Sequence, residues 1–156
     1  MRAYLDELGL PRHDVRLDIS RIHRLAIDAI AEMPDADLTA AAGAPLELAR
    51  ALRGARTLVE AREIARQILT PSAVALGDEA RPTLDRFAEL REPTADHLDE
   101  PDARAIVREL KAVGGNLKLL RLALTGAERG PELWTVVAAV PREEALRRAA
   151  AAITPR

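Results

Sequence analysis

Three histidines are the first residues to consider for chemistry, since imidazole is the commonest general base and metal ligand in proteins. They are His13, His23 and His97. None has a second histidine three or four residues away, the spacing that places two ligands on one helix face. His97 could form an oxygen-rich metal loop with Asp99 and Asp102, but a helix N-cap followed by an acid in the first turn explains both aspartates better. We therefore expect no metal site.

Other catalytic signatures are missing as well. The sequence has no cysteine, which removes disulfides, thiolate nucleophiles and cysteine-ligated metal sites. It contains no Gly-x-Ser-x-Gly, no Walker loop and no Gly-x-Gly-x-x-Gly. The pair Gly114-Gly115 before Asn116 is interpreted as a helix break. The sequence thus predicts no cofactor and disfavours a small metal-dependent hydrolase.

Basic side chains are the remaining candidates for a functional role, and they are unevenly distributed along the sequence. Residues 1–70 carry 10 bases and 11 acids, residues 71–104 carry 4 and 9, and residues 105–156 carry 9 and 5, for nets of −1, −5 and +4. The total of −2 argues against indiscriminate nucleic-acid binding, whereas the basic final third allows one local phosphate-contacting face. A solvated helical surface is the alternative. Arginine supplies 21 of the 23 bases, an excess that we ascribe mainly to coding bias.

The elements that position these bases are expected to be helices. The chain is 48% hydrophobic, 31% charged and 2% aromatic, a mixture typical of a globular domain of helix-forming residues. No stretch reaches the run of about 18 apolar residues that a membrane span needs. The N-terminal sequence lacks a signal-peptide pattern, so the expected location is the cytoplasm and no membrane partner is expected.

Caps, breakers and apolar spacing predict an all-α fold. Ser20 is expected to cap a helix that ends at Pro34 and buries one face. Its inward residues would be Ile22, Leu25, Ala26, Ala29 and Ile30. Further helices are predicted over 35–42, 46–53, 58–69, about 83–91, 100–113 and 117–125, with Leu58, Ala61, Ala65, Ile68 and Leu69 inward in the 58–69 helix and caps at Gly43, Thr57, Asp99, Asn116 and Gly126. Pro131 and Pro141 are expected in the first turns of the last two helices.

Proline clusters divide the predicted helices into two small helical subdomains. The first covers residues 1–70 and the second residues 102–156. Residues 71–101 would be a proline-rich hinge that contains one helix.

The most informative stretch is LLRLALTGAERGPELW, from Leu119 to Trp134. A helix would end at Gly126, a short loop would hold Arg129, and Gly130-Pro131 would start the next helix with Glu132 in its first turn. The stretch resembles the C-terminal region of glutamyl-tRNA synthetases, class I aminoacyl-tRNA synthetases, in which Leu-Arg-x-Ala-Leu-Thr-Gly is followed by Gly-Pro or Ser-Pro and an apolar helix. The residues that fit this pattern are Arg121, Ala123, Leu124, Thr125, Gly126, Gly130, Pro131 and Leu133.

Two further segments are similar to the same family in the same order. ALRGARTLVEAREIARQIL, residues 51–69, resembles a helix with an Arg-Ala-x-Thr-Leu core, which Arg56, Thr57 and Leu58 match. The ending PREEALRRAAAA resembles the closing helix of the family, with paired bases at Arg147 and Arg148. Together the three segments span about residues 20–152.

The resemblance implies an all-helical anticodon-binding region that binds tRNA, with tRNA-Glu as the expected partner. The motifs resembling His-Ile-Gly-His and Lys-Met-Ser-Lys, which handle ATP in the catalytic half of a glutamate–tRNA ligase, are missing from this sequence. The chain alone is therefore expected not to charge tRNA. It would be a C-terminal fragment or a free-standing paralogue, working with a catalytic synthetase domain or another protein partner. A degenerate synthetase-like helical module that binds a protein is the alternative.

Recognition of unpaired bases would fall mainly to arginines, which stack and donate two hydrogen bonds at once. The candidate cations are Lys118, Arg121, Arg129, Arg142, Arg147 and Arg148, with Arg53 and Arg56 extending the surface from the first half. For Arg121 a buried pair with an acid is an equal alternative. Arg147 and Arg148 would point in different directions, so at most one of them would face a given ligand. Trp134 is interpreted as a core anchor in preference to a base platform.

Overall fold

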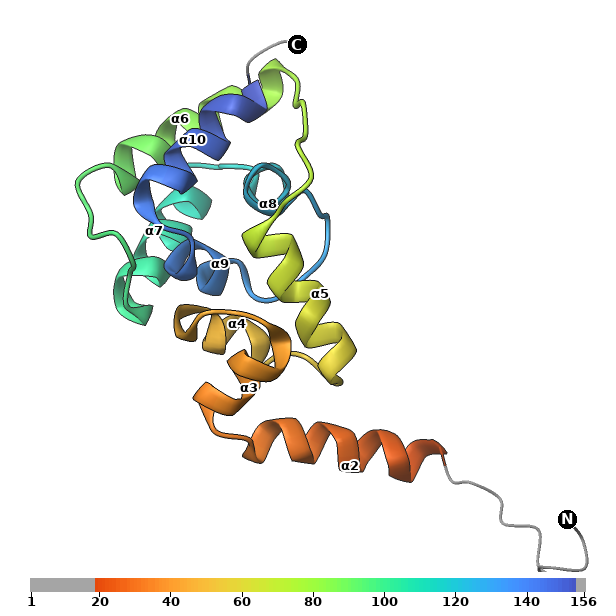
Figure 1. Ribbon diagram of the computed structural model, residues 1–156. Coiled ribbons are helices and arrows are strands. Elements are labelled where there is room, and N and C mark those ends of the chain that lie inside the picture. Colours follow the sequence, from red (N-terminus) through yellow and green to blue (C-terminus); the bar gives the residue numbers. More distant parts are fainter. Residues whose placement is uncertain (1–18, 154–156) are drawn as a thin grey trace, which may run out of the picture.

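The computed structural model describes residues 19–153, and these residues form nine α-helices and no strand (Figure 1). The α-helices are α2 (Ile19–Glu32), α3 (Asp35–Ala42), α4 (Ala49–Leu52), α5 (Leu58–Leu69), α6 (Arg81–Arg91), α7 (Glu100–Ala112), α8 (Leu117–Thr125), α9 (Leu133–Ala139) and α10 (Arg142–Ile153). Two 3₁₀ turns, η1 (Leu46–Leu48) and η2 (Asp78–Ala80), precede α4 and α6. The all-α prediction is confirmed.

Five of the helix ends follow from the capping residues. Three polar side chains accept hydrogen bonds from backbone amides of the first turn: Thr57 from Glu60 at 3.1 Å, Asp99 from Asp102 at 2.9 Å and Asn116 from Lys118 at 3.1 Å. Gly43 and Gly126 end α3 and α8 in the left-handed conformation, at φ 70° and 68°. A Cβ on Gly126 would also lie 2.5 Å from the Ser72 carbonyl oxygen, so this close approach requires glycine as well.

Four helix starts differ from the sequence expectations. Ser20 lies within the first turn of α2, which already begins at Ile19. Pro131 and Pro141 both precede their helices, since α9 begins at Leu133 and α10 at Arg142. The expected 46–53 helix opens with the 3₁₀ turn η1 and continues as α4 to Leu52. A proline fixes its own φ for a helix start without requiring that its residue be helical, which explains both proline errors.

Helices α3 to α10 share one hydrophobic core. The closest packing joins α7 to α9, α6 to α10, α8 to α10, and α3 to α5. Leu52, Phe87 and Val136, from three different parts of the chain, are fully buried in the same cluster. The segment after α5 packs across the end of α10, where the Leu76 amide donates to the Ala152 carbonyl oxygen at 2.8 Å. The division into segments 1–70, 71–101 and 102–156 stays a prediction.

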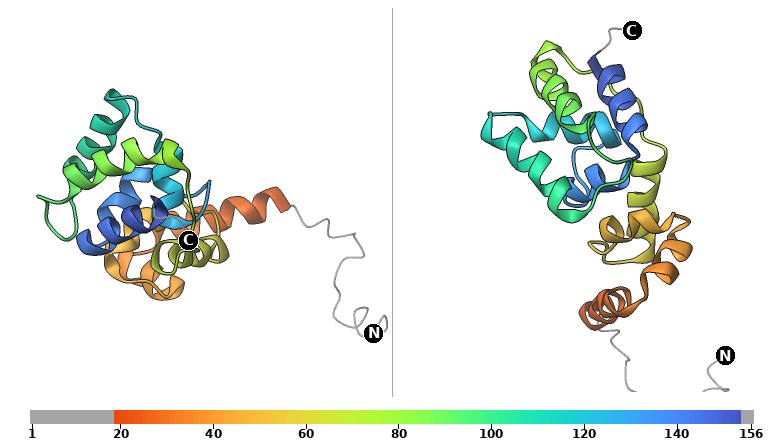
Figure 2. Two further views of the ribbon diagram at one scale, coloured as in Figure 1. Left: turned by 90° about the horizontal axis from the view of Figure 1, so that it is seen from above. Right: turned by 90° about the vertical axis from the view of Figure 1, so that its left-hand side faces the viewer.

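Helix α2 departs most from expectation. It projects from the rest of the bundle, as the two views of Figure 2 also show. Ile30 is its buried residue, whereas Ile22 and Leu25, expected to face the core, are 47% and 61% exposed. The prediction that this helix buries its apolar face is therefore wrong: apolar spacing indicates that a helix has a face to bury but not that the described chain supplies the cover. Leu69 of α5, also expected inward, is exposed.

Candidate functional site

A groove of about 430 Å³ separates the turn after α4 from the start of α9. Its first wall comes from Arg50, Ala51, Arg53 and Gly54; its second wall comes from Pro131, Glu132, Trp134 and Thr135; and Glu100, at the start of α7, completes it. The two walls belong to segments about 80 residues apart in the sequence, which packing of α4 against α9 brings together. The groove is thus a product of tertiary structure.

Trp134 provides an aromatic surface at this groove. Its ring is half-buried, and the Arg104 guanidinium lies over it, 4.3 Å from the ring centroid. The indole N–H donates a hydrogen bond to the Glu132 carboxylate, which also lies 3.7 Å from Arg104. Trp134 also packs against the hydrophobic core, so the core-anchor interpretation holds in part. Tryptophan rings and arginine guanidinium groups are side chains on which proteins stack unpaired nucleobases.

Arg53 lines the groove and at the same time closes the C-terminal end of α2. Its Nη1 donates to the Ile30 carbonyl oxygen at 2.9 Å and its Nη2 to that of Met33 at 2.6 Å, and the guanidinium pairs with Asp35. Helix C-termini leave carbonyl groups without partners and carry a partial negative charge, and a guanidinium compensates both. Arg53 is therefore committed to the fold, and at most its exposed edge is available to a ligand.

The charges around the groove nearly balance. Arg50 lies 3.5 Å from Glu100, and Arg104 donates to the same carboxylate at 2.8 Å. These contacts are between exposed side chains, which solvent screens, so they rearrange at little cost when a ligand enters. The arrangement favours stacking and hydrogen bonding over simple phosphate attraction.

Arg121 supports the second wall from behind. Its Nη1 donates to the Pro131 carbonyl oxygen at 2.6 Å, and partial burial lowers the pKa of its guanidinium. The sequence left open whether Arg121 pairs with a buried acid or contacts RNA, and its partner in the structure is a backbone carbonyl. Arg121 thereby fixes the loop that presents Pro131 and Trp134 to the groove.

The other candidate cations are dispersed. Lys118 pairs with Glu128 at 3.3 Å, Arg142 donates to the Thr94 carbonyl oxygen at 3.2 Å, and Arg147 pairs with Glu144. Arg56 and Arg129 are exposed. None of these five is among the described residues that line the groove.

Arg148 has an internal role. Its side chain is 7% exposed, and its Nη1 donates to the carbonyl oxygens of Ile68 at 2.8 Å and Leu124 at 2.7 Å, near the ends of α5 and α8. Its Nε donates to Glu144 at 2.6 Å. The prediction that Arg147 and Arg148 point in different directions is confirmed, since Arg147 is 67% exposed. Arg148 is too enclosed to offer its guanidinium to RNA.

Glu144 gives this cluster a pH dependence. Hydrogen bonds from Arg147 and then Arg148 lower the pKa of Glu144 from 4.5 to about 2. A carboxyl group with a lowered pKa stabilises the fold above its ordinary pKa, and this contribution disappears as the pH falls from 4.5 towards 2. We expect Glu144→Gln to cost about 1 kcal/mol at neutral pH, after solvent screening, and progressively less below pH 4.5. Urea unfolding at several pH values measures this difference.

Glu63 provides the matched control for that experiment. Its pKa is also lowered to about 2, by hydrogen bonds from Arg66 and Gln67, but the side chains of Glu63 and Arg66 are both exposed to solvent, which screens the pair. Glu63→Gln should therefore change stability much less at every pH. An equal loss for both variants would contradict a specific role for the Glu144 cluster.

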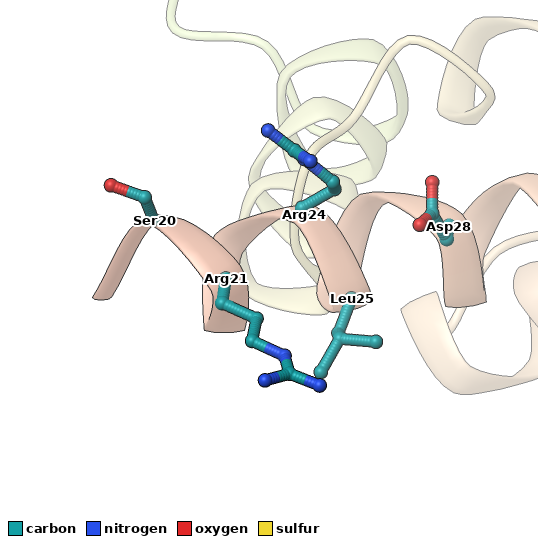
Figure 3. A pocket seen from close by; sticks show the side chains of 5 residues that line it. All are labelled: Ser20, Arg21, Arg24, Leu25 and Asp28. Atoms are coloured by element: carbon teal, nitrogen blue, oxygen red, sulfur yellow. The ribbon is translucent and has the colours of Figure 1, made fainter. Parts of the chain in front are cut away.

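Two further hollows lie away from the groove. One, of about 230 Å³, is lined mainly by apolar side chains, with His97, Glu144 and Arg148 among its polar residues. His97 Nδ1 lies 3.1 Å from the Ala139 carbonyl oxygen. The other lies on α2, which supplies every described residue that lines it, and its side chains diverge around the helix (Figure 3).

Sequence reasoning missed Arg50 and Glu100, which line the groove, and Arg104, which lies over the Trp134 ring. Each sits on a helix whose pattern indicates an ordinary solvated face, and only the tertiary packing brings them beside Trp134. Fully buried Arg91 was also missed. No signal in a single sequence distinguishes it from the exposed arginines around it.

Comparison with known proteins adds no relative: no family model matches the chain, and no curated protein matches it. Among residues 19–153, no group of three or more His, Cys, Asp or Glu side chains could hold a metal ion. Across the same described residues, no helix has the length and apolarity needed to cross a membrane.

Proposed function

We propose that this chain binds the anticodon arm of a tRNA, with tRNA-Glu as the expected ligand, and that unpaired bases enter the groove beside Trp134. One observation carries the proposal. Of the segments that resemble glutamyl-tRNA synthetases, the one at 51–69 supplies Ala51, Arg53 and Gly54 to one wall. The segment Leu119–Trp134 supplies Pro131, Glu132 and Trp134 to the other.

The chemistry of the groove fits single-stranded RNA. Unpaired bases are recognised by stacking on aromatic rings and guanidinium planes, worth about 1–3 kcal/mol per base, and by hydrogen bonds to their edges. Trp134 and Arg104 offer the stacking surfaces, and carboxylates such as Glu132 accept hydrogen bonds from base amino groups. In this proposal any aminoacylation depends on a catalytic synthetase domain.

Binding to tRNA tests the proposal directly. The purified chain is titrated with unmodified tRNA-Glu and with a non-cognate tRNA at two salt concentrations. We expect selective binding to tRNA-Glu that weakens as salt rises, because phosphate contacts release counterions. Equal weak binding to both tRNAs, or no binding at low salt, would exclude anticodon recognition.

Substituting Trp134 tests the site itself. We expect Trp134→Ala to weaken tRNA-Glu binding by about 1–3 kcal/mol, roughly 5-fold to 150-fold, because one base loses its stacking partner. Arg86→Ala on α6 is the control, since Arg86 pairs with Glu89 and Glu109, lies outside the groove lining and should leave affinity unchanged. Equal losses in the two variants would locate RNA binding elsewhere. Circular dichroism confirms that each variant is folded.

A further inference from the structure

Helix α2 presents an apolar face that the described chain leaves open. Ile19, Ile22 and Leu25 are 64%, 47% and 61% exposed, and Ala26 continues the same stripe. Near its C-terminal end the helix is held to the bundle by burial of Ile30 and by the Arg53 contacts described above. In the view of Figure 3, Leu25 and Arg21 project on one side of α2 and Arg24 projects on the other. An exposed stripe of this kind is typical of an interaction surface.

The charges along α2 indicate which partner fits the stripe. Arg21, His23 and Arg24 lie in its N-terminal half, whereas Asp28 and Glu32 lie in its C-terminal half. Its first turn contains no acid and its last turn contains no base. This order is the reverse of the one that the helix macrodipole favours. An antiparallel neighbour of the same sequence would compensate both the dipole and the side-chain charges.

The side of α2 next to Leu25 also carries a base towards its N-terminal end and acids towards its C-terminal end. At about 100° per residue, Asp28 and Glu32 lie within about 20° of Arg21 around the helix axis, next to Leu25. In a two-fold symmetric antiparallel pair, equivalent flanks of the two helices meet. Arg21 of each copy would then lie beside Asp28 of the other, with Leu25 near the axis.

We propose that α2 is a self-association surface, on which a second copy of this chain packs its own α2 in antiparallel orientation. Ile22 of one copy then lies opposite Ala26 of the other, and Ile19 opposite Ala29, so that large side chains pack against small ones. The same alignment brings Arg21 against Asp28 twice. A parallel pair would instead bring basic halves together and acidic halves together. The inference is independent of RNA binding at the groove.

The expected dimer is weak. A helix of 14 residues is about 21 Å long, so the contact lies at the small end of protein interfaces. Dissociation in roughly the micromolar range is therefore expected. The projection of α2 from the bundle leaves its exposed side open to a second helix.

Sedimentation equilibrium over a wide range of concentrations tests the oligomeric state of the full chain. We expect a concentration-dependent dimer, which Leu25→Asp weakens by at least about tenfold. Val59→Asp is the matched control, because Val59 is an apolar residue 74% exposed on α5. Asp28→Arg changes charge without removing apolar surface, and it should weaken the dimer, whereas the double variant Arg21→Asp/Asp28→Arg should restore it.

Cysteine cross-linking tests the orientation, because the chain has no cysteine of its own. We expect Leu25→Cys to form an intermolecular disulfide readily and Val59→Cys to form one slowly. A mixture of Ile22→Cys and Ala26→Cys chains should yield mainly the mixed disulfide. A chain that stays monomeric at all concentrations, a dimer insensitive to Leu25→Asp, or equal cross-linking at Leu25 and Val59 would each overturn the proposal. Burial of the α2 face by another part of the chain or by a different protein would appear as one of these results.

Discussion

Replacing Arg148 by methionine is expected to lower the free energy of unfolding by about 3 kcal/mol, although methionine fills much of the same apolar space. The loss arises because the carbonyl oxygens of Ile68 and Leu124 would remain buried without their donor. An unsatisfied buried acceptor costs about 1–3 kcal/mol. Both carbonyls lie in the last turn of a helix, where no backbone amide is available to replace the guanidinium.

Two variants separate this geometric role from a role of charge alone. Arg148→Lys keeps the positive charge, but a compact ammonium cannot span two carbonyls and the Glu144 carboxylate as a planar guanidinium does, so it should rescue only part of the loss. Arg147→Ala, one position earlier and bonded to the same glutamate, should cost no more than the roughly 1 kcal/mol expected for Glu144→Gln, because Arg147 is exposed. Urea unfolding of the three variants measures these differences. Full rescue by lysine would show that the positive charge, and not the planar shape of the guanidinium, stabilises the contacts among α5, α8 and α10.

The comparison between Arg147 and Arg148 illustrates what one sequence reveals. Helix periodicity predicts that adjacent residues point in different directions, and the structure confirms it. Helix periodicity does not predict which of the two side chains points inward, because that depends on the helices packed around α10. The excess of arginine was ascribed mainly to coding bias, yet Arg53, Arg91 and Arg148 each use several guanidinium donors to satisfy backbone carbonyls.

Helix ends could be predicted where they depend on residues close together in the sequence. Thr57, Asp99 and Asn116 were identified as caps because a capping hydrogen bond joins residues two or three positions apart. Gly126 was identified because its left-handed conformation strongly favours glycine. The exposed face of α2 could not be predicted, because its amphipathic pattern is the same whether the face packs inside the bundle or against another molecule.

The candidate site was predictable only in part. The sequence predicts a functional role for the stretch that ends at Trp134, and Pro131, Glu132 and Trp134 of this stretch line one wall of the groove. Arg50, Glu100 and Arg104 complete the site from other helices, and their sequence neighbours give no indication of it. Arg129, favoured for its position in a loop, and Arg142, chosen for its charge, lie outside the groove lining. Residue types and their spacing in the sequence therefore indicate which segment lines a site. They do not indicate which residues from other helices lie beside it.

The largest loss of stability is expected from Arg91→Met, about 4 kcal/mol. Arg91 is fully buried at the end of α6 and donates to Thr94 Oγ1 and to the carbonyl oxygens of Ala95, Asp96 and Val140, at 2.5–3.2 Å. Burial lowers the pKa of its guanidinium, while the charge of Asp96 opposes that shift. Methionine would leave the buried Val140 carbonyl oxygen without a partner and would also break the three part-buried contacts to the loop.

The same contacts predict where the structure would open. Arg91 holds the loop between α6 and α7 against the end of α9, and the Leu98 amide donates to the Ala138 carbonyl oxygen at 3.2 Å in the same junction. In Arg91→Met, hydrogen exchange at the Leu98 amide should accelerate more than exchange within α5, which packs elsewhere. Arg86→Ala, at a half-buried arginine on the same helix that pairs with carboxylates alone, serves as the control and should change stability and exchange much less than Arg91→Met. The Nε of Arg91 has no partner, so part of the gain from the four acceptors is offset. A loss below about 1 kcal/mol would mean that this desolvation cost nearly cancels the hydrogen bonds, and that the loop is held by apolar packing of Leu98 instead.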